Sequence, residues 1–235
     1  MTMILRKTVG ALVMASTVAL AAAGAFAHET AATESHAHDH AHDHAHDHDH
    51  AHGHAEKTDR VGEGYFEDDQ IKPRELSDWA GEWQSVYPYL QDGTLDEVIA
   101  HKAEHGDKSA DEYRAYYDNG YKTDIDRITI EGDRVSLAGG GGNISAQYET
   151  DGFEILTYEK GNRGVRYIFK KVAGDAGAPA YIQFSDHIIA PQKAGHYHLY
   201  WGDDRQAVLN ELESWPTYYP AELTGAQIAS EMLAH

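Results

Sequence analysis

Three histidines near the C-terminal end of the chain have the residue type and the spacing of a metal site. One residue separates His196 from His198, and a short segment with Pro191 and Gly195 separates both from His187. Successive side chains of a β-strand point to opposite faces, so His196 and His198 would share a face. If a hairpin pairs residue 187 with either of them, the third histidine is a diagonal neighbour, and the Cβ separations are about 5–8 Å. Three neutral imidazoles at such distances can bind one zinc ion.

Three protein ligands would leave the fourth position of a tetrahedral zinc ion open, which suits either catalysis by zinc-bound water or the carriage of zinc. Catalysis calls for a general base, but the chain has no H-E-x-x-H motif, and strand alternation would turn Asp186 away from His187. We therefore predict a carrier rather than an enzyme. The alternative is that His196 and His198 are surface histidines beside a buried Tyr197, and a register slip of one residue would move His187 to the other face.

A second set of histidines lies in the N-terminal part of the chain. Residues 36–54 read HAHDHAHDHAHDHDHAHGH, with no aliphatic side chain larger than alanine. Because such a segment cannot bury enough apolar surface to offset the entropy of ordering, we expect residues 28–60 to be disordered without a ligand. Many weak sites on a flexible tether would raise the metal concentration near the folded site, whereas the alternative is a tail that only adds solubility. The predicted weak ligands are His36, His38, His40, His42, His44, His46, His48, His50, His52 and His54.

Residues 1–27 predict a secretory signal peptide. Arg6 and Lys7 precede a small-apolar stretch, and Ala25-Phe26-Ala27 fits a cleavage site. The apolar stretch is short for a membrane anchor, and no later segment is apolar enough to span a bilayer. We therefore expect export, with no membrane association after cleavage.

The composition indicates cations as ligands. The chain has 19 Lys and Arg against 39 Asp and Glu, and its formal net charge of −20 would repel nucleic acid and anionic lipid. It has no cysteine, so disulfides are excluded and any metal must be held by nitrogen and oxygen ligands. Such a site suits Zn²⁺, although copper or nickel would compete for it.

The remaining residues, 61–235, are predicted to form one globular domain that begins and ends with helices. Capping boxes at Thr94, Ser109 and Thr224 predict three helix starts. His101 and His105 lie one turn apart on the first of these helices and are interpreted as part of its solvated face. The predicted helices are 95–105, 110–117 (ended by Asn119-Gly120), 204–214 and a last one after Thr224.

Between these helices the pattern changes to short strands. Their near-even spacing and their turns, such as Glu131-Gly132-Asp133 and Thr150-Asp151-Gly152, predict an antiparallel barrel or sandwich. The predicted strands are 125–130, 134–138, 144–149, 153–159, 164–170, 180–189 and 196–201.

Five segments of the domain carry a resemblance to a known family. They are LSDWAGEWQSVYPYL (76–90), GYKTDID (120–126), KGNRGVRYIFK (160–170), YIQFSDHIIAPQKAGHYHLYWGDD (181–204) and LNELESWPTYYP (209–220). In these segments the domain resembles the ZinT family of periplasmic zinc-binding proteins, which also supplies the C-terminal module of some AdcA-type zinc lipoproteins. The resemblance implies a lipocalin-like (calycin) antiparallel β-barrel with added helices. It also implies a zinc site formed by His187, His196 and His198. Some members carry a cysteine pair that would fall near Ala146 and Lys171, where this chain has none.

The same resemblance implies a function in the periplasm under zinc limitation. The family captures Zn²⁺ and passes it toward a ZnuA-type binding component of an ABC transporter, and some members bind cadmium. Two alternatives come from other classes of protein. One is a lipocalin-like carrier of a small organic ligand, which would need an open apolar barrel. The other is a zinc hydrolase that uses the open fourth position.

Overall fold

The computed structural model describes residues 60–158 and 161–234, all within one compact unit that spans residues 49–235. The predicted signal peptide and the histidines of the predicted tail lie outside the described residues. The domain boundary predicted at residues 60 and 61 therefore stays a prediction. No helix in the described ranges is long and apolar enough to cross a membrane.

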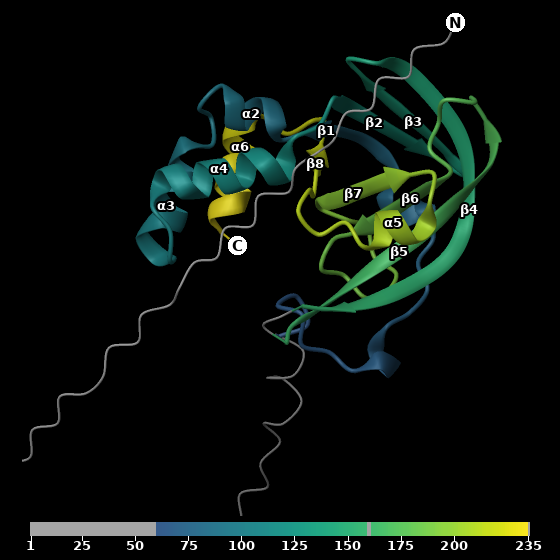
Figure 1. Ribbon diagram of the computed structural model, residues 1–235, viewed down its shortest axis with the longest axis horizontal. Helices are drawn as coiled ribbons and strands as arrows, with labels where there is room; N and C mark the ends of the chain where they lie inside the picture. The colour runs from purple at the N-terminus through teal and green to yellow at the C-terminus, as the bar shows by residue number, and fades with distance from the viewer. Residues whose placement is uncertain (1–59, 159–160, 235) are drawn as a thin grey trace, which may run out of the picture. The chain divides into compact units, whose positions relative to one another are not determined.

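The described part of the chain is mainly β-structure, as predicted, and its strands form a closed antiparallel barrel in the order β1 to β8. Each strand pairs with the next along the chain, and β8 pairs with β1 to close the barrel (Figure 1). Closure gives each of these eight strands a neighbour on both sides. The strands are β1 Gly81–Ser85, β2 Ile125–Glu131, β3 Arg134–Gly139, β4 Gly142–Thr157, β5 Arg163–Gly174, β6 Tyr181–Ser185, β7 Tyr197–Gly202 and β8 Thr217–Pro220.

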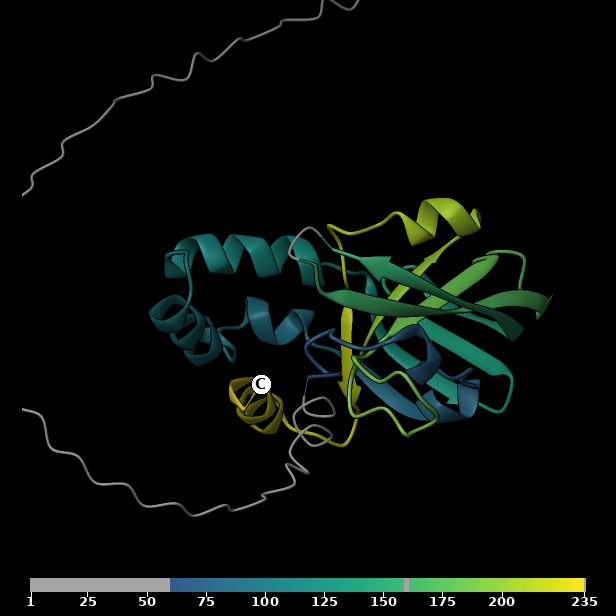
Figure 2. The ribbon, with the colours of Figure 1, turned by 90° about the horizontal axis from the view of Figure 1, so that it is seen from below.

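Four helices gather on one side of the barrel, where Figure 2 shows the teal helices close to the yellow C-terminal helix. They enclose their own apolar cluster, which includes Leu90, Val98, Tyr121 and Ile228. Tyr219 of β8 joins this cluster, so the barrel and the helices share packing. The four helices are α2 Tyr87–Gln91, α3 Asp96–His105, α4 Ala110–Tyr121 and α6 Gly225–Leu233; the shorter elements are η1 Asp68–Gln70, η2 Leu76–Trp79 and α5 Arg205–Leu209.

Two of the three predicted capping boxes are present. The hydroxyls of Ser109 and Thr224 accept hydrogen bonds from backbone amides at the starts of α4 and α6. The box predicted at Thr94 is wrong, because α3 begins after Leu95 without a side-chain cap. The predicted end of α4 at Asn119-Gly120 is also wrong, since the helix continues to Tyr121. Gly120 serves packing instead: a Cβ there would lie 2.2 Å from the Trp215 ring.

The strand prediction needs two corrections. The two runs predicted on either side of Thr150-Asp151-Gly152 form one strand, β4, and the residues predicted as a turn are a bulge at which the register with β5 shifts. Strands β1 and β8 were not predicted, because GEWQS and TYYP are short and lack apolar alternation.

Aromatic side chains fill the barrel. Trp79 is fully buried and stacks on Phe184 with ring centroids 4.7 Å apart, and Trp83 meets Tyr197 at 4.6 Å. A carrier of an organic ligand would need an open interior, whereas this core is packed.

Candidate metal site

The structure brings His187, His196 and His198 together where β6 and β7 meet. His198 lies in β7 and pairs with Ser185, the last residue of β6. His196 lies just before β7, and His187 lies two residues beyond β6. The strand predicted over 180–189 is therefore too long, because β6 ends at Ser185. The ladder places Ser185 opposite His198, and its continuation would place residue 187 opposite residue 196, which is the register that the same-face hypothesis required.

The three imidazole rings form a nearly equilateral triangle. Their centroids are 6.0 Å apart for His187 and His196, 5.9 Å for His187 and His198, and 6.2 Å for His196 and His198. No three His, Asp or Glu side chains in the described ranges are arranged as a finished metal site. The rings would therefore have to turn toward a common ion for each nitrogen to reach a zinc–nitrogen distance of about 2.0–2.1 Å.

A hydrogen-bond chain fixes the orientation of His198. The Thr217 hydroxyl donates to the Trp215 carbonyl at 2.9 Å, and His198 Nδ1 lies 2.8 Å from the same hydroxyl oxygen. Since that hydroxyl proton is already used, the oxygen accepts from His198, and Nδ1 carries the proton. The lone pair of Nε2 then remains for a metal, which is the usual arrangement behind a metal-binding histidine.

Burial lowers the pKa of His198 well below its ordinary value of 6.5, and the nearby charges of His187, His196 and Arg166 lower it further. The imidazole is therefore neutral near pH 7. A neutral imidazole is the form that binds zinc, so Nε2 of His198 does not have to release a proton when a metal binds.

The other two histidines are held by different means. The His196 ring stacks on Tyr219 of β8 with centroids 5.1 Å apart and an angle of 15° between planes. His187 is exposed and has a φ of 64°, which makes it the one non-glycine residue with positive φ in the described ranges. Histidine enters this left-handed region more readily than most residues, and such backbone often marks a functional position.

A cavity of about 620 Å³ lies beside the three histidines, between the barrel and the helices. Thr217 and Tyr219 line its barrel side, whereas α3, α4 and α6 supply Lys102, Tyr117, Tyr121 and Met232. A second cavity of about 480 Å³ also reaches His187 and His198 and is bordered by Arg166. The histidines thus face open space in which an ion and a further ligand could be placed.

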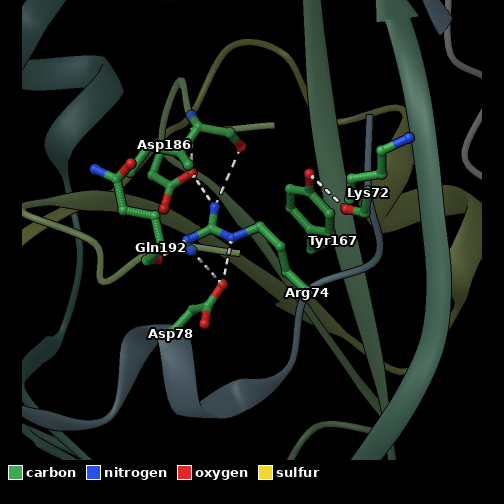
Figure 3. A network of polar contacts seen from close by, with 7 residues as sticks. Lys72, Arg74, Asp78, Tyr167, Asp186 and Gln192 are labelled. Carbon is green, nitrogen blue, oxygen red and sulfur yellow. Dashed lines mark hydrogen bonds and ion pairs between the residues drawn. The ribbon is translucent and has the colours of Figure 1, made fainter. Parts of the chain in front are cut away.

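Asp186 also lines the larger cavity, but one oxygen of its carboxylate is bonded to Arg74. The Asp186 side chain is fully buried, and its Oδ1 accepts from Arg74 Nη1 at 2.6 Å (Figure 3). Sequence reasoning missed both Arg74 and Thr217. Thr217 lies in a strand that the pattern did not predict, and an isolated arginine carries no signal of its partners.

Two other histidines that the sequence analysis considered stay apart from this site. His101 and His105 lie together on α3 with ring centroids 4.3 Å apart, and neither lines the two cavities. The predicted tail ligands, His36 to His54, lie outside the described residues.

Comparison with known proteins gives a consistent result. The family described as ZinT (YodA) periplasmic lipocalin-like zinc-recruitment matches residues 57–235. The probable metal-binding protein YrpE of Bacillus subtilis is 60% identical over 181 residues, which cover 77% of this chain and 72% of YrpE. The zinc-binding protein AdcA of Streptococcus pyogenes is 53% identical over 183 residues, which cover 76% of this chain but only 36% of AdcA.

A solved structure extends the likeness to three dimensions. The crystal structure of the Zn(II)-bound ZinT-like domain of Streptococcus pneumoniae AdcA superposes with a TM-score of 0.72 and 49% identity. The match covers 74% of this chain and 97% of that domain. With the fold, the histidine cluster and the match over residues 57–235 in agreement, the chain belongs to the ZinT family.

Proposed function

We propose that this protein captures Zn²⁺ at His187, His196 and His198 and delivers it to a zinc uptake system in the periplasm. The triangle of imidazoles, with centroids about 6 Å apart and Nε2 of His198 left free by Thr217, supports this assignment most directly. The names of the relatives support it as well, since AdcA is called a zinc-binding protein and its ZinT-like domain was crystallised with Zn(II).

Delivery rather than catalysis fits the surroundings of the site. A hydrolase would need a carboxylate or another base beside the zinc-bound water. Two carboxylate residues line the larger cavity: Asp186 is engaged by Arg74 through Oδ1, and Glu63 is paired with Arg60. The open fourth position would then accept a ligand from a donor or an acceptor, such as a ZnuA-type component of an ABC transporter.

The N-terminal residues would complete the proposal. Residues 1–27 would direct export, and the histidines between His36 and His54 would collect metal weakly and keep it near the folded site. Cadmium, which also accepts imidazole ligands, would compete with zinc at the three histidines.

Zinc titration of the mature chain in competition with a chromophoric chelator tests the assignment. We expect one tight site per chain, because the chelator outcompetes the weak tail sites. The triple variant His187→Ala, His196→Ala, His198→Ala should lose that tight site. The double variant His101→Ala, His105→Ala is the matched control and should retain it. A tight site that survives the triple substitution would show that the assignment is wrong.

A further inference from the structure

The residues that carry two of the three histidines belong to one irregular segment, which we call the metal loop (residues 186–196). It runs from the end of β6 to the start of β7, with His187 near its beginning and His196 at its end. Irregular backbone holds side chains less firmly than a strand does, yet metal ligands must be placed to within about 0.5 Å. Something outside the loop must therefore fix it.

A second segment, which we call the clamp (residues 72–80), runs along the metal loop and bonds to it repeatedly. The amide of Lys72 donates to the Ile189 carbonyl at 2.8 Å, and the Ala194 amide donates to the Asp78 carbonyl at 2.8 Å. The side chain of Lys193 also donates to the Ala80 carbonyl. The clamp contains η2, whose Leu76 and Trp79 are buried in the core, so it is itself anchored.

Arg74 is the centre of these contacts. Its guanidinium is fully buried and donates through Nη1 to Asp186 Oδ1 at 2.6 Å and to the Ile188 carbonyl at 3.2 Å. Nη2 donates to the Gln192 carbonyl at 2.8 Å. Nε donates to Asp78 Oδ2 at 2.8 Å, and that same oxygen accepts from the Gln192 amide at 3.1 Å. Figure 3 shows these bonds converging on one side chain.

The bonds of Arg74 fall on both sides of His187. Asp186 precedes this histidine and Ile188 follows it, so one nitrogen of Arg74 holds both neighbours of a residue whose φ is 64°. A left-handed backbone is strained for most residues and persists only where its surroundings fix it. Arg74 supplies that constraint at His187, and through Gln192 it also restrains the segment that leads to His196.

We propose that Arg74 is a positioning residue of the metal site, which holds His187 and the metal loop in the geometry that zinc requires. This inference rests on the proposed function, because it assumes that the three histidines bind the metal. The planar guanidinium reaches four acceptors at once, which a lysine ammonium cannot do with the same geometry. The planar set of N–H donors, rather than the positive charge, is therefore the property of Arg74 that positions the metal loop.

The test uses Co²⁺ in place of Zn²⁺, because the visible spectrum of Co²⁺ reports coordination geometry. The variant is Arg74→Met combined with Asp186→Asn, which removes the guanidinium and neutralises the fully buried carboxylate. The second carboxylate partner, Asp78, is partly exposed and keeps the hydrogen bond from the Gln192 amide. Arg74→Lys keeps the positive charge but loses the planar set of N–H donors. Leu137→Ala, in the barrel core at β3, is the control that destabilises the fold and leaves the metal loop untouched. The spectrum of the His187→Ala, His196→Ala, His198→Ala variant is subtracted as the contribution of other sites.

We expect the double variant to fold, to show faster amide hydrogen exchange over residues 188–196, to bind Zn²⁺ about 10- to 100-fold more weakly and to give an altered Co²⁺ spectrum. Arg74→Lys should give nearly the same spectrum as the double variant, whereas Leu137→Ala should give the wild-type spectrum. A wild-type spectrum and affinity in a folded double variant would overturn the proposal. If wild type and the triple histidine variant gave the same Co²⁺ spectrum, the proposed function itself would fail, and the two failures are thus distinguishable.

Discussion

Two buried arginines lie near the candidate metal site, and their surroundings differ sharply. Arg74 and Arg166 are each only 1% exposed. Arg74 bonds to two carboxylates and two carbonyls. Arg166, in β5, donates from Nη2 to the Glu211 carbonyl at 2.8 Å, while Nε and Nη1 have no acceptor within the described part of the chain.

The difference shows that burial alone does not define the role of a charged side chain. Arg74 is compensated by its partners and ties two segments together, so it contributes to structure. Arg166 lies over the ring of Tyr200, with Cζ 3.1 Å from the ring centroid, and burial lowers the pKa of its guanidinium below the usual value. Its charge is weakly compensated and acts on its surroundings, which include His198.

The largest expected effect separates the two arginines by stability. Arg74→Met should lower the free energy of unfolding by about 3–5 kcal/mol, because it leaves the buried Asp186 carboxylate without its partner. Arg166→Met should change the free energy of unfolding by less than about 1 kcal/mol, because methionine replaces a poorly bonded cation with an apolar chain of similar size. Urea unfolding of both metal-free variants measures the difference. Equal losses of unfolding free energy in the two variants would mean that hydrogen bonding does not distinguish Arg74 from Arg166.

The uncharged hydroxyl of Thr217 gives a second test of whether hydrogen bonding decides the contribution of a buried polar group. Thr217→Val keeps the shape of the side chain but removes the hydroxyl that orients His198. The affinity for Zn²⁺ should fall about 10- to 100-fold, as expected when a metal-binding histidine loses its supporting acceptor. Chelator competition measures it, with Thr129→Val in β2 as the matched control. If both valine variants bind zinc as the wild type does, the hydroxyl does not support the site.

The smallest expected effect concerns charge. Arg166 borders the cavity that His187 and His198 reach, so its positive charge opposes an incoming cation. Arg166→Met should therefore strengthen Zn²⁺ binding by about 2- to 5-fold at low ionic strength, and salt should reduce the gain. Arg134→Met, a surface variant with the same change of charge, should have a smaller effect. Loss of Arg74 would then weaken metal binding, and loss of Arg166 would strengthen it. A fall in the affinity for Zn²⁺ in Arg166→Met would contradict this contrast between the two arginines.

The sequence contained enough information for most of the fold. Period-two patterns located β2, β3 and β7, because their alternation reflects one more buried and one more exposed face. The prediction also located β5, although its residues 165–169 are all buried. The prediction from sequence patterns failed where tertiary contacts override local signals. Gly120 was interpreted as a helix stop, whereas the absent side chain makes room for Trp215. The turn signal at Thr150-Asp151-Gly152 marks a bulge within a continuous strand, because pairing with β5 resumes beyond it.

The candidate site also has a part that the sequence predicted and a part that it did not. Spacing alone suggested that His187, His196 and His198 share a face, and the structure places them within about 6 Å of one another. The residues that support them, Arg74 and Thr217, act through contacts across 112 and 19 residues of sequence, and no local pattern encodes such contacts.

The backbone at His187 also bears on how metal preference could change during evolution. A φ of 64° is tolerated by histidine, asparagine, aspartate and glycine, and it excludes β-branched residues. Aspartate at this position would exchange an imidazole for a carboxylate ligand without a backbone penalty, and carboxylates favour harder cations such as Mn²⁺. The same exchange at His198 would place an aspartate within a barrel strand, where it is disfavoured. If the three histidines bind the metal, position 187 therefore accepts a carboxylate ligand more readily than position 198 does.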